Sequence, residues 1–328
     1  MRTKKRILLV GIVILMYQLF ISGTVAAKER EYPEKAVRFL VGYAPGSVFD
    51  LSARALSKVA PKYLGKPLVV VNMPGAASTV ALNELVKSTP DGYTIASAST
   101  GYSSTTIHQQ KVPFDPKIPR PVLGYWDMRH GLFVRADSPY ARLEELIDYG
   151  KKVPGGIKYG HSGKGIVTHL MGMALFKNAN VTATDVPYKG SNDVVQAVIG
   201  GHILSGVTDI SAVKQHVGSG TLKLVVVFLD ERAEDFPEVP SSKEKGYVDV
   251  SVLNPIGFIS IHKDTPLDRV ETLHRALKKT IEDTEFREIM ANIGQKCRYI
   301  SPEMVEEKIL KSERLGVPLL KELNLFVQ

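Results

Sequence analysis

Short apolar runs alternate with helix-like segments in the first third of this 328-residue chain. The runs at 36–41, 67–71 and 94–99 have the length and composition of strands. The segments between them, 51–64 and 78–87, repeat their apolar residues with a helical period. Strands that alternate with helices build a largely parallel sheet covered by those helices. We therefore expect an α/β fold.

The same alternation restarts further along the chain. Ser138 and Pro139 begin a predicted helix, and 222–229 is a predicted strand. A chain of this length exceeds one ordinary domain. We expect two α/β lobes, joined where the predicted strands 124–134 and 248–261 cross between them. The predicted domains are 28–125 together with 252–328 for the first lobe and 126–251 for the second.

The N-terminus has the pattern of a secretory signal peptide. A basic start (Arg2, Lys4, Lys5, Arg6) precedes the apolar run 7–21, and small residues at 25–27 form a cleavage point. An uncleaved membrane anchor is the alternative, but this run is shorter than the roughly 20 residues that cross a bilayer. We predict a signal peptide of residues 1–27. With no Cys near that point for a lipid anchor, the mature chain is expected in the periplasm.

Charge and composition argue against nucleic-acid and metal partners. Removing residues 1–27 takes away four positive charges, so the formal net charge falls from +8 to +4. The remaining charges are mixed, and no basic stripe is interleaved with aromatic residues, so we expect no nucleic-acid binding. Cys297 is the single cysteine, so we expect no internal disulfide. We expect neither a cofactor nor a metal.

Two strand-to-helix turns have the composition of anion-binding loops. Residues 41–50 (VGYAPGSVFD) and 72–79 (NMPGAAST) each follow an apolar strand and open a helix-like segment. The first N–H groups of a helix lack internal partners and lie at the positive end of its dipole, which favours a carboxylate. The alternative is two ordinary turns, capped by Asp50 and by Ser78.

Enzyme motifs do not fit this chain. The stretch 160–163 (GHSG) is no nucleophile elbow, because Lys164 stands where the second Gly is needed. The Gly163-Lys164 pair fails as a phosphate loop, because Gly165 replaces the required Ser or Thr. The eight histidines are dispersed. We expect no catalytic residues, and a hydrolase is the least supported alternative.

Several motifs in a fixed order resemble one family. They are YPEK at 32–35, the 45–50 loop, NMPGA at 72–76, PDGYT at 90–94, the stretch 160–170 and VPYKG at 186–190. Together they resemble the Bug-type receptors, the extracytoplasmic solute-binding subunits of tripartite tricarboxylate transporters. The resemblance implies a two-lobed periplasmic-binding-protein fold of type II, a Venus flytrap with two crossover strands. It also implies a monomer that binds a small organic carboxylate and delivers it to integral-membrane permease subunits.

The resemblance also implies a binding site made of backbone amides from two facing loops and from a helix start in the other lobe. The first group of candidates is Tyr43, Gly46, Ser47, Val48, Phe49 and Asp50, and the second is Ala76, Ala77, Ser78 and Thr79. The second lobe contributes Ser162, Lys164, Val167, Thr168 and His169, with Tyr188 and Asp209 as further contacts. For Lys164 and His169 the alternatives are a solvated loop residue and a structural side chain.

Departures from the family pattern bear on the ligand. Ser47, Val48 and Phe49 stand where relatives carry glycines, Ala77 and Ser78 replace a Gly pair, and Ile166 replaces a common Thr. Phe49 with Tyr43, Tyr102 and Trp126 is expected to form an apolar wall, which favours a carboxylate with an aromatic or alkyl body. The alternative places these aromatic residues in the core. The sequence also leaves open an amino-acid ligand whose amino group meets Asp50, and a sensing role in place of transport.

Overall fold

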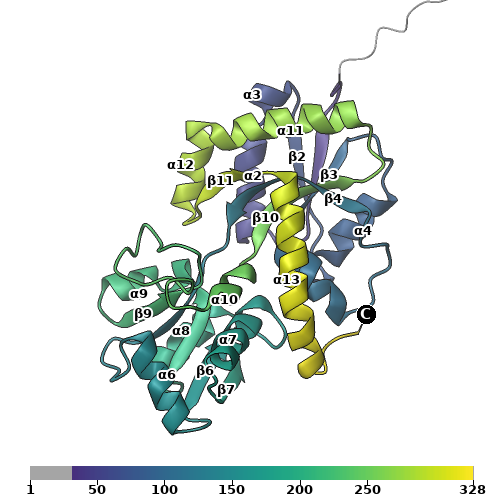
Figure 1. Cartoon of the computed structure of the whole chain (residues 1–328). Coiled ribbons are helices and arrows are strands. Elements are labelled where there is room, and N and C mark those ends of the chain that lie inside the picture. Colours follow the sequence, from purple (N-terminus) through teal and green to yellow (C-terminus); the bar gives the residue numbers. More distant parts are fainter. Residues whose placement is uncertain (1–31, 328) are drawn as a thin grey trace, which may run out of the picture. The chain divides into compact units, whose positions relative to one another are not determined.

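The computed structural model describes residues 32–327, so the predicted signal peptide lies outside the described residues. From Lys35 onward the chain forms one compact unit (Figure 1). Within residues 32–327, every helix is too short or too polar to cross a membrane.

The first lobe is built on a six-stranded sheet in the order β11-β4-β10-β3-β1-β2. The strands β1 (Val37–Val41), β2 (Leu68–Asn72) and β3 (Thr94–Ser99) are parallel, with β1 in the middle. The strand β10 (Ile256–His262) is antiparallel to β3 and to β4 (Pro119–Asp127), which β11 (Cys297–Ile300) joins at the edge.

Helices follow the strands β1, β2, β3, β10 and β11 of this lobe. They are α2 (Val48–Val59), α3 (Pro61–Leu64), η1 (Ala76–Ser78), α4 (Thr79–Lys87), α5 (Thr100–Ser104), η2 (Thr106–Gln109), α11 (Leu267–Glu282), α12 (Thr284–Asn292) and α13 (Pro302–Glu322). Because β1 and β2 are parallel neighbours, both strands finish at the same end of the sheet. The turns that lead from them into α2 and α4 therefore lie at that end.

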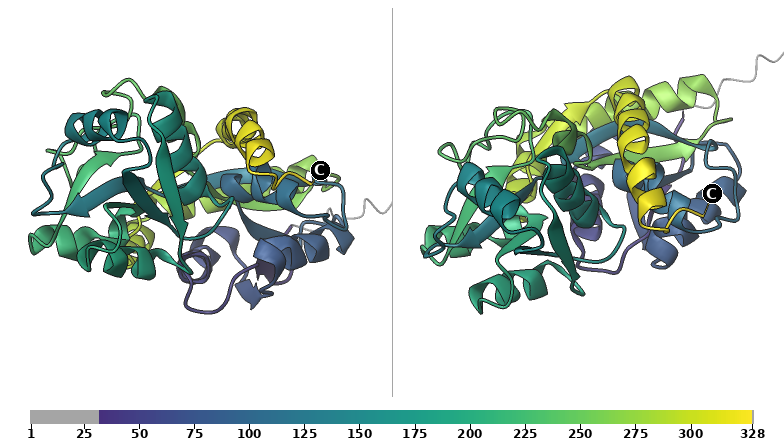
Figure 2. Two further views of the ribbon diagram at one scale, coloured as in Figure 1. Left: turned by 90° about the horizontal axis from the view of Figure 1, so that it is seen from below. Right: turned by 60° about the horizontal axis from the view of Figure 1, so that its bottom comes forward.

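The second lobe is built on a five-stranded sheet in the order β7-β6-β8-β5-β9. Its strands are β5 (His130–Arg135), β6 (Ile157–His161), β7 (Ala183–Pro187), β8 (Ser205–Asp209) and β9 (Leu222–Val227). Its helices are α6 (Leu143–Lys152), α7 (Val167–Asn178), α8 (Ser191–Ile199), η3 (Ile210–Ala212), α9 (Lys214–Gly218) and α10 (Val248–Val252). Figure 2 shows these teal and green strands apart from the blue and purple strands of the first lobe.

The α/β alternation and the two crossings are as predicted, but the two crossing segments differ in detail. The expected strand 124–134 is two strands, because β4 ends at Asp127 in one sheet and β5 begins at His130 in the other. The expected strand 248–261 begins as helix α10. Val250 and Leu253, three residues apart, are both buried, so this segment buries a helical face, and Pro255 then separates it from β10. The exact domain boundaries stay a prediction.

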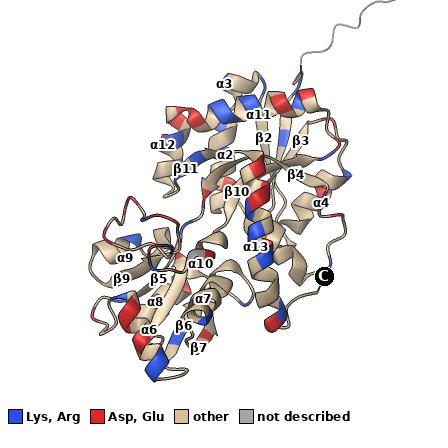
Figure 3. Ribbon diagram, viewed as in Figure 1, with Lys and Arg blue, Asp and Glu red and all other residues tan. Residues whose placement is uncertain are grey.

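Each lobe has its own core, and α13 contacts both lobes. Leu40, Leu82 and Phe258 belong to one core cluster in the first lobe. The cluster of the second lobe includes Leu319 and Leu320 from the end of α13, which packs against both α5 and α7 (Figure 1). On the surface, helices α6, α11, α12 and α13 carry positive and negative residues together (Figure 3).

Candidate functional site

The turn between β1 and α2 is organised by Ser47 and Asp50. Ser47 has an extended backbone, and its Oγ accepts a hydrogen bond from the Asp50 amide at 3.2 Å. Ser47 is therefore the cap of α2, and the prediction that Asp50 is the cap was wrong. Asp50 lies in the first turn, where its carboxylate accepts from the amide of Gly46 at 2.8 Å, from Arg54 Nε at 3.0 Å and from Asn72 Nδ2 at 2.8 Å.

Asp50 is 1% exposed, and its carboxylate binds only groups of the first lobe. Burial acts to raise its pKa, but hydrogen bonds from Arg54, Gly46 and Asn72 outweigh burial and hold the pKa below the ordinary 3.8. A carboxylate with three internal donors is poorly placed to receive the amino group of a ligand. This geometry removes the support for an amino-acid ligand that the sequence suggested.

Two of the predicted amide donors in this turn have internal acceptors. The Gly46 amide donates to Asp50, and the Ser47 amide donates to Ala44 O at 3.2 Å. Val48 and Phe49 are the first two residues of α2, and among residues 32–327 neither amide has a hydrogen-bond acceptor. The amides of Val48 and Phe49 are therefore the candidate donors of this turn that have no use inside the described residues.

Aromatic residues pack beside this turn in a partly buried stack. The ring of Tyr43 lies 4.3 Å from that of Phe49 at an interplanar angle of 12°, and Phe49 meets Trp126 edge to face at 5.2 Å. Trp126 is fully buried beside Gly257, where a Cβ atom would lie 2.6 Å from the indole Cδ1, so Trp126 is a core residue. Tyr102 is also buried. Of the predicted wall, only Tyr43 is half-exposed, while Phe49 is 8% exposed.

The Tyr43 hydroxyl is a neutral group at this site. Burial, with a smaller contribution from Tyr102, raises the pKa of Tyr43 to about 12. A neutral phenol does not repel a carboxylate, and its hydroxyl can donate a hydrogen bond to one.

The turn between β2 and α4 has an unusual backbone. Ala76, Ala77 and Ser78 have φ values of 44°, 51° and 82°, so three successive residues with side chains are left-handed. Each such residue costs about 1 to 2 kcal/mol, a strain that is typical of ligand-binding turns. The amides of Ala76 and Ala77 have no acceptor among the described residues, and Ser78 Oγ, although buried, has no partner there either. Ser78 precedes α4 without capping it through its side chain.

The two turns are in contact with each other. A Cβ atom on Gly42 would lie 2.6 Å from Ser78 Cα, so the end of β1 touches the second turn. Asn72, at the end of β2, donates from Nδ2 to Tyr43 O at 3.1 Å as well as to Asp50. Neither Gly42 nor Asn72 was among the predicted site residues, although both lie within the predicted loop segments 41–50 and 72–79.

Thr79 connects the second turn to α5. Its Oγ1 lies 2.8 Å from Tyr102 OH and accepts a hydrogen bond from Gln110 Nε2 at 2.8 Å. Gln110 Nε2 also donates to Ala76 O at 3.1 Å. The Thr79 side chain is therefore occupied inside the first lobe, where it supports the turn.

The third candidate segment lies between β6 and α7. Ser162 N donates to Thr168 Oγ1 at 3.2 Å, so Thr168 ties the loop to the helix start. The amides of Lys164, Val167 and Thr168 have no acceptor among residues 32–327, and the Lys164 side chain is exposed. In this segment the amides of Lys164, Val167 and Thr168 are therefore unused within the described residues, whereas the Ser162 amide is not.

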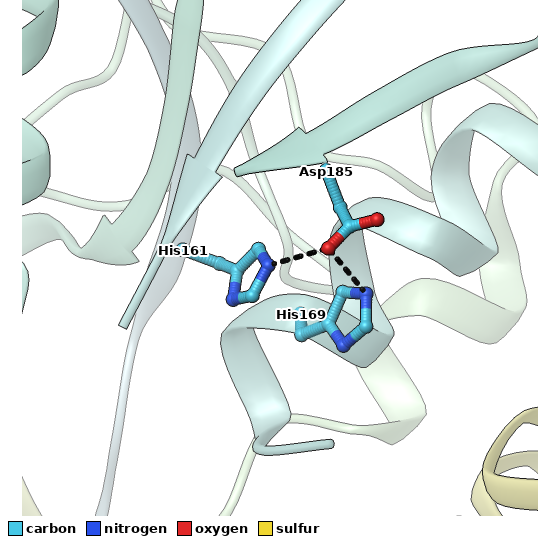
Figure 4. A group of neighbouring side chains, drawn as sticks. All are labelled: His161, His169 and Asp185. Atoms are coloured by element: carbon cyan, nitrogen blue, oxygen red, sulfur yellow. Dashed lines mark hydrogen bonds and ion pairs between the residues drawn. The ribbon is translucent and has the colours of Figure 1, made fainter. Parts of the chain in front are cut away.

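His169 is held within the second lobe. Its Nδ1 accepts from the Gly165 amide at 3.0 Å, and its ring stacks on that of His161 at 4.2 Å and 15° (Figure 4). Asp185, from the neighbouring strand β7, faces both rings (Figure 4). Neither His161 nor Asp185 was among the predicted residues, because their separation along the chain leaves no local signal. The parallel pairing of β6 with β7 brings them together.

The third segment approaches the first lobe at α5 and η2. A Cβ atom on Gly101 would lie 3.1 Å from Val167 Cγ2, and Gln109 Nε2 donates to Gly165 O at 3.0 Å. The helix start of the second lobe thus contacts the residues that flank Tyr102. The second and the third predicted segments thus both contact α5.

Two predicted residues of the second lobe are engaged elsewhere. The Tyr188 amide donates to His161 O at 2.9 Å, and its side chain packs against a core cluster of the second lobe. Asp209 caps η3 by accepting from the Ser211 amide at 2.8 Å. Their contact with a ligand stays a prediction.

Comparison with known proteins adds three findings. A profile described as Tripartite tricarboxylate transporter family receptor matches residues 52–325. A UPF0065 protein in the gbd 5′ region of Cupriavidus necator is 30% identical over 300 residues, which cover 91% of this chain and 90% of that protein. A TctC solute binding protein from Polaromonas superposes with a TM-score of 0.81 at 23% identity, covering 89% of this chain and 99% of that one.

A further solved structure, the periplasmic binding protein BugD, superposes with a TM-score of 0.69 at 26% identity and covers 90% of this chain and 100% of its own. Together with the two sheets described above, these likenesses confirm the predicted two-lobed type II fold.

Proposed function

Because the chain belongs to the tripartite tricarboxylate transporter receptor family, as its motifs predicted, we propose that it captures a small organic carboxylate outside the cytoplasm and delivers it to a membrane permease. The family consists of solute-binding receptors, so the chain is not an enzyme. The carboxylate, the permease and the periplasmic location belong to the proposal.

The observation that carries the proposal is the set of amides without internal acceptors at, or just before, the starts of three helices. They belong to Val48 and Phe49, to Ala76 and Ala77, and to Lys164, Val167 and Thr168. N–H groups at the positive ends of helix dipoles stabilise a carboxylate without a fixed cation. Exchange of these hydrogen bonds for water allows release to the permease.

Binding begins, in this proposal, at the two turns of the first lobe, which strand pairing already holds side by side. Closure then adds the start of α7, guided by the contacts of Gly101 with Val167 and of Gln109 with Gly165. A ligand shifts the equilibrium toward the closed form only by the extra contacts that it makes there. The closed form is the one that the permease recognises.

The body of the ligand is proposed to be aromatic or alkyl. Tyr43 is half-exposed and stacks on Phe49, so its ring can cover an apolar ligand surface beside the amides of α2. The left-handed residues Ala76 to Ser78 carry small side chains and leave little polar surface for a second or third carboxylate.

A thermal-shift and calorimetric screen tests the proposal. Phenylacetate, adipate and citrate are compared with phenylacetamide, adipamide and other uncharged amides of the same shape. At 100 times its dissociation constant, a true ligand stabilises the folded chain by about 2.7 kcal/mol. Stabilisation by phenylacetate, less by adipate and least by citrate, with none from the amides, is expected; equal effects of carboxylates and amides, or none from any carboxylate, would contradict the proposal.

Proline substitutions at helix starts delete single amides. Val48→Pro and Val167→Pro place proline at the first position of α2 and α7, after residues whose extended backbone tolerates it. Each is expected to weaken binding about tenfold, the effect of losing one charge-assisted hydrogen bond. Thr284→Pro, at the first position of α12 away from the three turns, is the matched control and should bind normally.

Location and a sensing role need separate tests. Mass analysis of the exported protein is expected to give a chain that begins at residue 28. Ligand uptake that depends on this chain and on membrane permease subunits supports transport, whereas a ligand response through a membrane kinase supports the sensing alternative.

A further inference from the structure

Two imidazoles and a carboxylate meet where β6, α7 and β7 come together (Figure 4). Asp185 Oδ2 lies 3.2 Å from His161 Nε2 and 3.6 Å from His169 Nε2. His161 and His169 are buried, whereas the Asp185 side chain is 31% exposed. Nothing in the proposed amide site explains why an acid and two histidines gather behind it.

Hydrogen bonds around the cluster favour protons on the imidazoles over a bound metal. His169 Nδ1 accepts from the Gly165 amide, so in the neutral ring the proton is on Nε2, the nitrogen that faces Asp185. A protonated Nε2 has no lone pair to give to a metal. The Asp185 carboxylate instead faces the protonated nitrogen of the tautomer that the Gly165 amide requires.

We propose that Asp185 is a positioning residue, which holds His169 in its Nε2-protonated tautomer so that Nδ1 fixes Gly165 and the amide-bearing loop 162–166. The inference rests on the proposed function only in that this loop serves a carboxylate. His161 has a different part, because its Nδ1 lies 2.8 Å from Gly163 O and 3.3 Å from Gly163 N. His161 can therefore hold Gly163 in either protonation state.

Gly165 connects this cluster to the first lobe. Its amide is held by His169, and its carbonyl accepts from Gln109 Nε2 at 3.0 Å. Gly165 has a φ of +74°, and a Cβ atom there would lie 2.8 Å from Leu325 Cδ1, so the position is confined as well as left-handed. Asp185, His169, Gly165 and Gln109 thus form one chain of contacts between the lobes.

The charged groups around His169 are few and close. Besides His161 and Asp185 they are Lys164 in the loop, and Lys177 and Glu322, which pair with each other at 2.5 Å on a cavity of about 280 Å³. Tyr159 also lines this cavity, and burial raises the pKa of its hydroxyl, so it stays neutral.

Acid is expected to release the loop. Burial, helped by His161 and Lys164 and opposed by Asp185, holds the pKa of His169 at about 4, below the ordinary 6.5. A protonated Nδ1 cannot accept from Gly165. The contribution of His169 to loop order is therefore complete above about pH 6.5. As the pH falls from 6.5 to about 4, the equilibrium constant for the ordered loop decreases by up to tenfold for each pH unit.

The test is made on the protein without ligand, so that it does not depend on the identity of the carboxylate. Nitrogen NMR of labelled histidine is expected to show His169 with a bare Nδ1 and a protonated Nε2 near neutral pH. Asp185→Asn should raise the population with a protonated Nδ1 and speed exchange of the Gly165 amide roughly five- to tenfold, the effect of losing one ordinary hydrogen bond. The matched control is Asp193→Asn on the exposed face of α8.

Two substitutions at His169 separate its two nitrogens. In His169→Asn the side-chain oxygen takes the place of Nδ1, so Gly165 should stay protected and lose its sensitivity to acid. In His169→Gln the amide takes the place of Nε2, so Gly165 should exchange rapidly at every pH. Gly46, whose amide donates to the Asp50 carboxylate, is the internal reference and should stay protected between about pH 7.5 and 4.5.

The positioning role would be overturned by a proton on Nδ1 of His169 in the unchanged protein, or by equal exchange in the Asp185 and Asp193 variants. A change in the His169 signals on adding a chelator would assign the cluster to a metal instead. Adipate and phenylacetate titrations form a separate arm. Their failure to bind would contradict the proposed function, while the tautomer result would stand.

Discussion

Gly42 and Ser78 are in direct contact, although they belong to different turns: a Cβ atom on Gly42 would lie 2.6 Å from Ser78 Cα. Gly42 follows β1, and Ser78 is the last of three left-handed residues before α4. The absence of a side chain at residue 42 is therefore what lets the second turn lie against the first. The amides of the two turns that lack an internal acceptor therefore lie at the same end of the sheet, where β1 and β2 finish.

Gly42→Ala is expected to destabilise the protein by about 1 to 3 kcal/mol, because the added methyl must displace backbone atoms of Ser78. Denaturant unfolding measures this loss, and phenylacetate affinity should fall with it. Gly218→Ala, where an added methyl meets open space, is the control. Equal unfolding midpoints in the two variants would show that the turns do not touch.

Asp50→Asn is expected to cost about 1 to 3 kcal/mol, because a buried carboxylate that accepts from Gly46, Arg54 and Asn72 is replaced by an amide. The folded-state pKa of Asp50 lies below 3.8, so its contribution is complete above pH 3.8 and is lost as the pH falls below that value.

The free energy of unfolding, measured at several pH values, should differ between Asp50→Asn and the unchanged protein by a constant amount near neutral pH. In acid this difference should become smaller. Asp137→Asn, which removes an exposed carboxylate paired with Arg135, should change stability by less than about 1 kcal/mol. If the stability difference between the two proteins grew in acid, the folded-state pKa of Asp50 would lie above 3.8, which would contradict the assigned direction of the shift.

Thr79→Val and Tyr102→Phe are expected to be non-additive. Each removes one partner of the 2.8 Å hydroxyl pair and leaves the other without it, so the double variant should lose about 1 kcal/mol less than the sum. A double-mutant cycle by denaturant unfolding measures the coupling, and Thr79→Ser, which keeps the hydroxyl, is the control. Full additivity would mean that the hydroxyl pair contributes nothing.

Gly101→Leu is expected to hold the lobes apart, because Val167 and Pro255 already lie within 3.2 Å of a Cβ atom at this position. Small-angle scattering with saturating phenylacetate should show a more extended particle than the unchanged protein, and affinity should fall about tenfold for each 1.4 kcal/mol of lost closure. Pairing the milder Gly101→Ala with Val167→Ala restores room and should recover binding. If the double variant did not recover binding, the contact between Gly101 and Val167 would have no part in closure.

Local patterns predicted the strands and helices well where one local signal dominated. The apolar runs at 36–41, 67–71 and 94–99 correspond to β1, β2 and β3, and the small-residue turns after β1 and β2 lead into helices as expected. The prediction of a strand over all of 248–261 was wrong at its start, because the alternating valines fit either period, and burial of Val250 and Leu253 selected a helix.

The candidate site could be located from the sequence but not resolved into donors and acceptors. Ser47 and Asp50 are both good caps, and only the observed backbone shows that Ser47 caps α2 while Asp50 binds Gly46. The sequence of Trp126 and its neighbours fits either a wall or a core role, and burial beside Gly257 decides for the core.

The sequence by itself determined the α/β order, the family and the three turns that start helices, because these follow from periodicity and short motifs along one stretch of chain. Tertiary structure alone decided that Gly42 touches Ser78, that the 46 and 47 amides are already used, and that Asp185 faces His169. Those relationships depend on which strands pair and how side chains pack, and residues far apart in the chain carry no local pattern that records their distance.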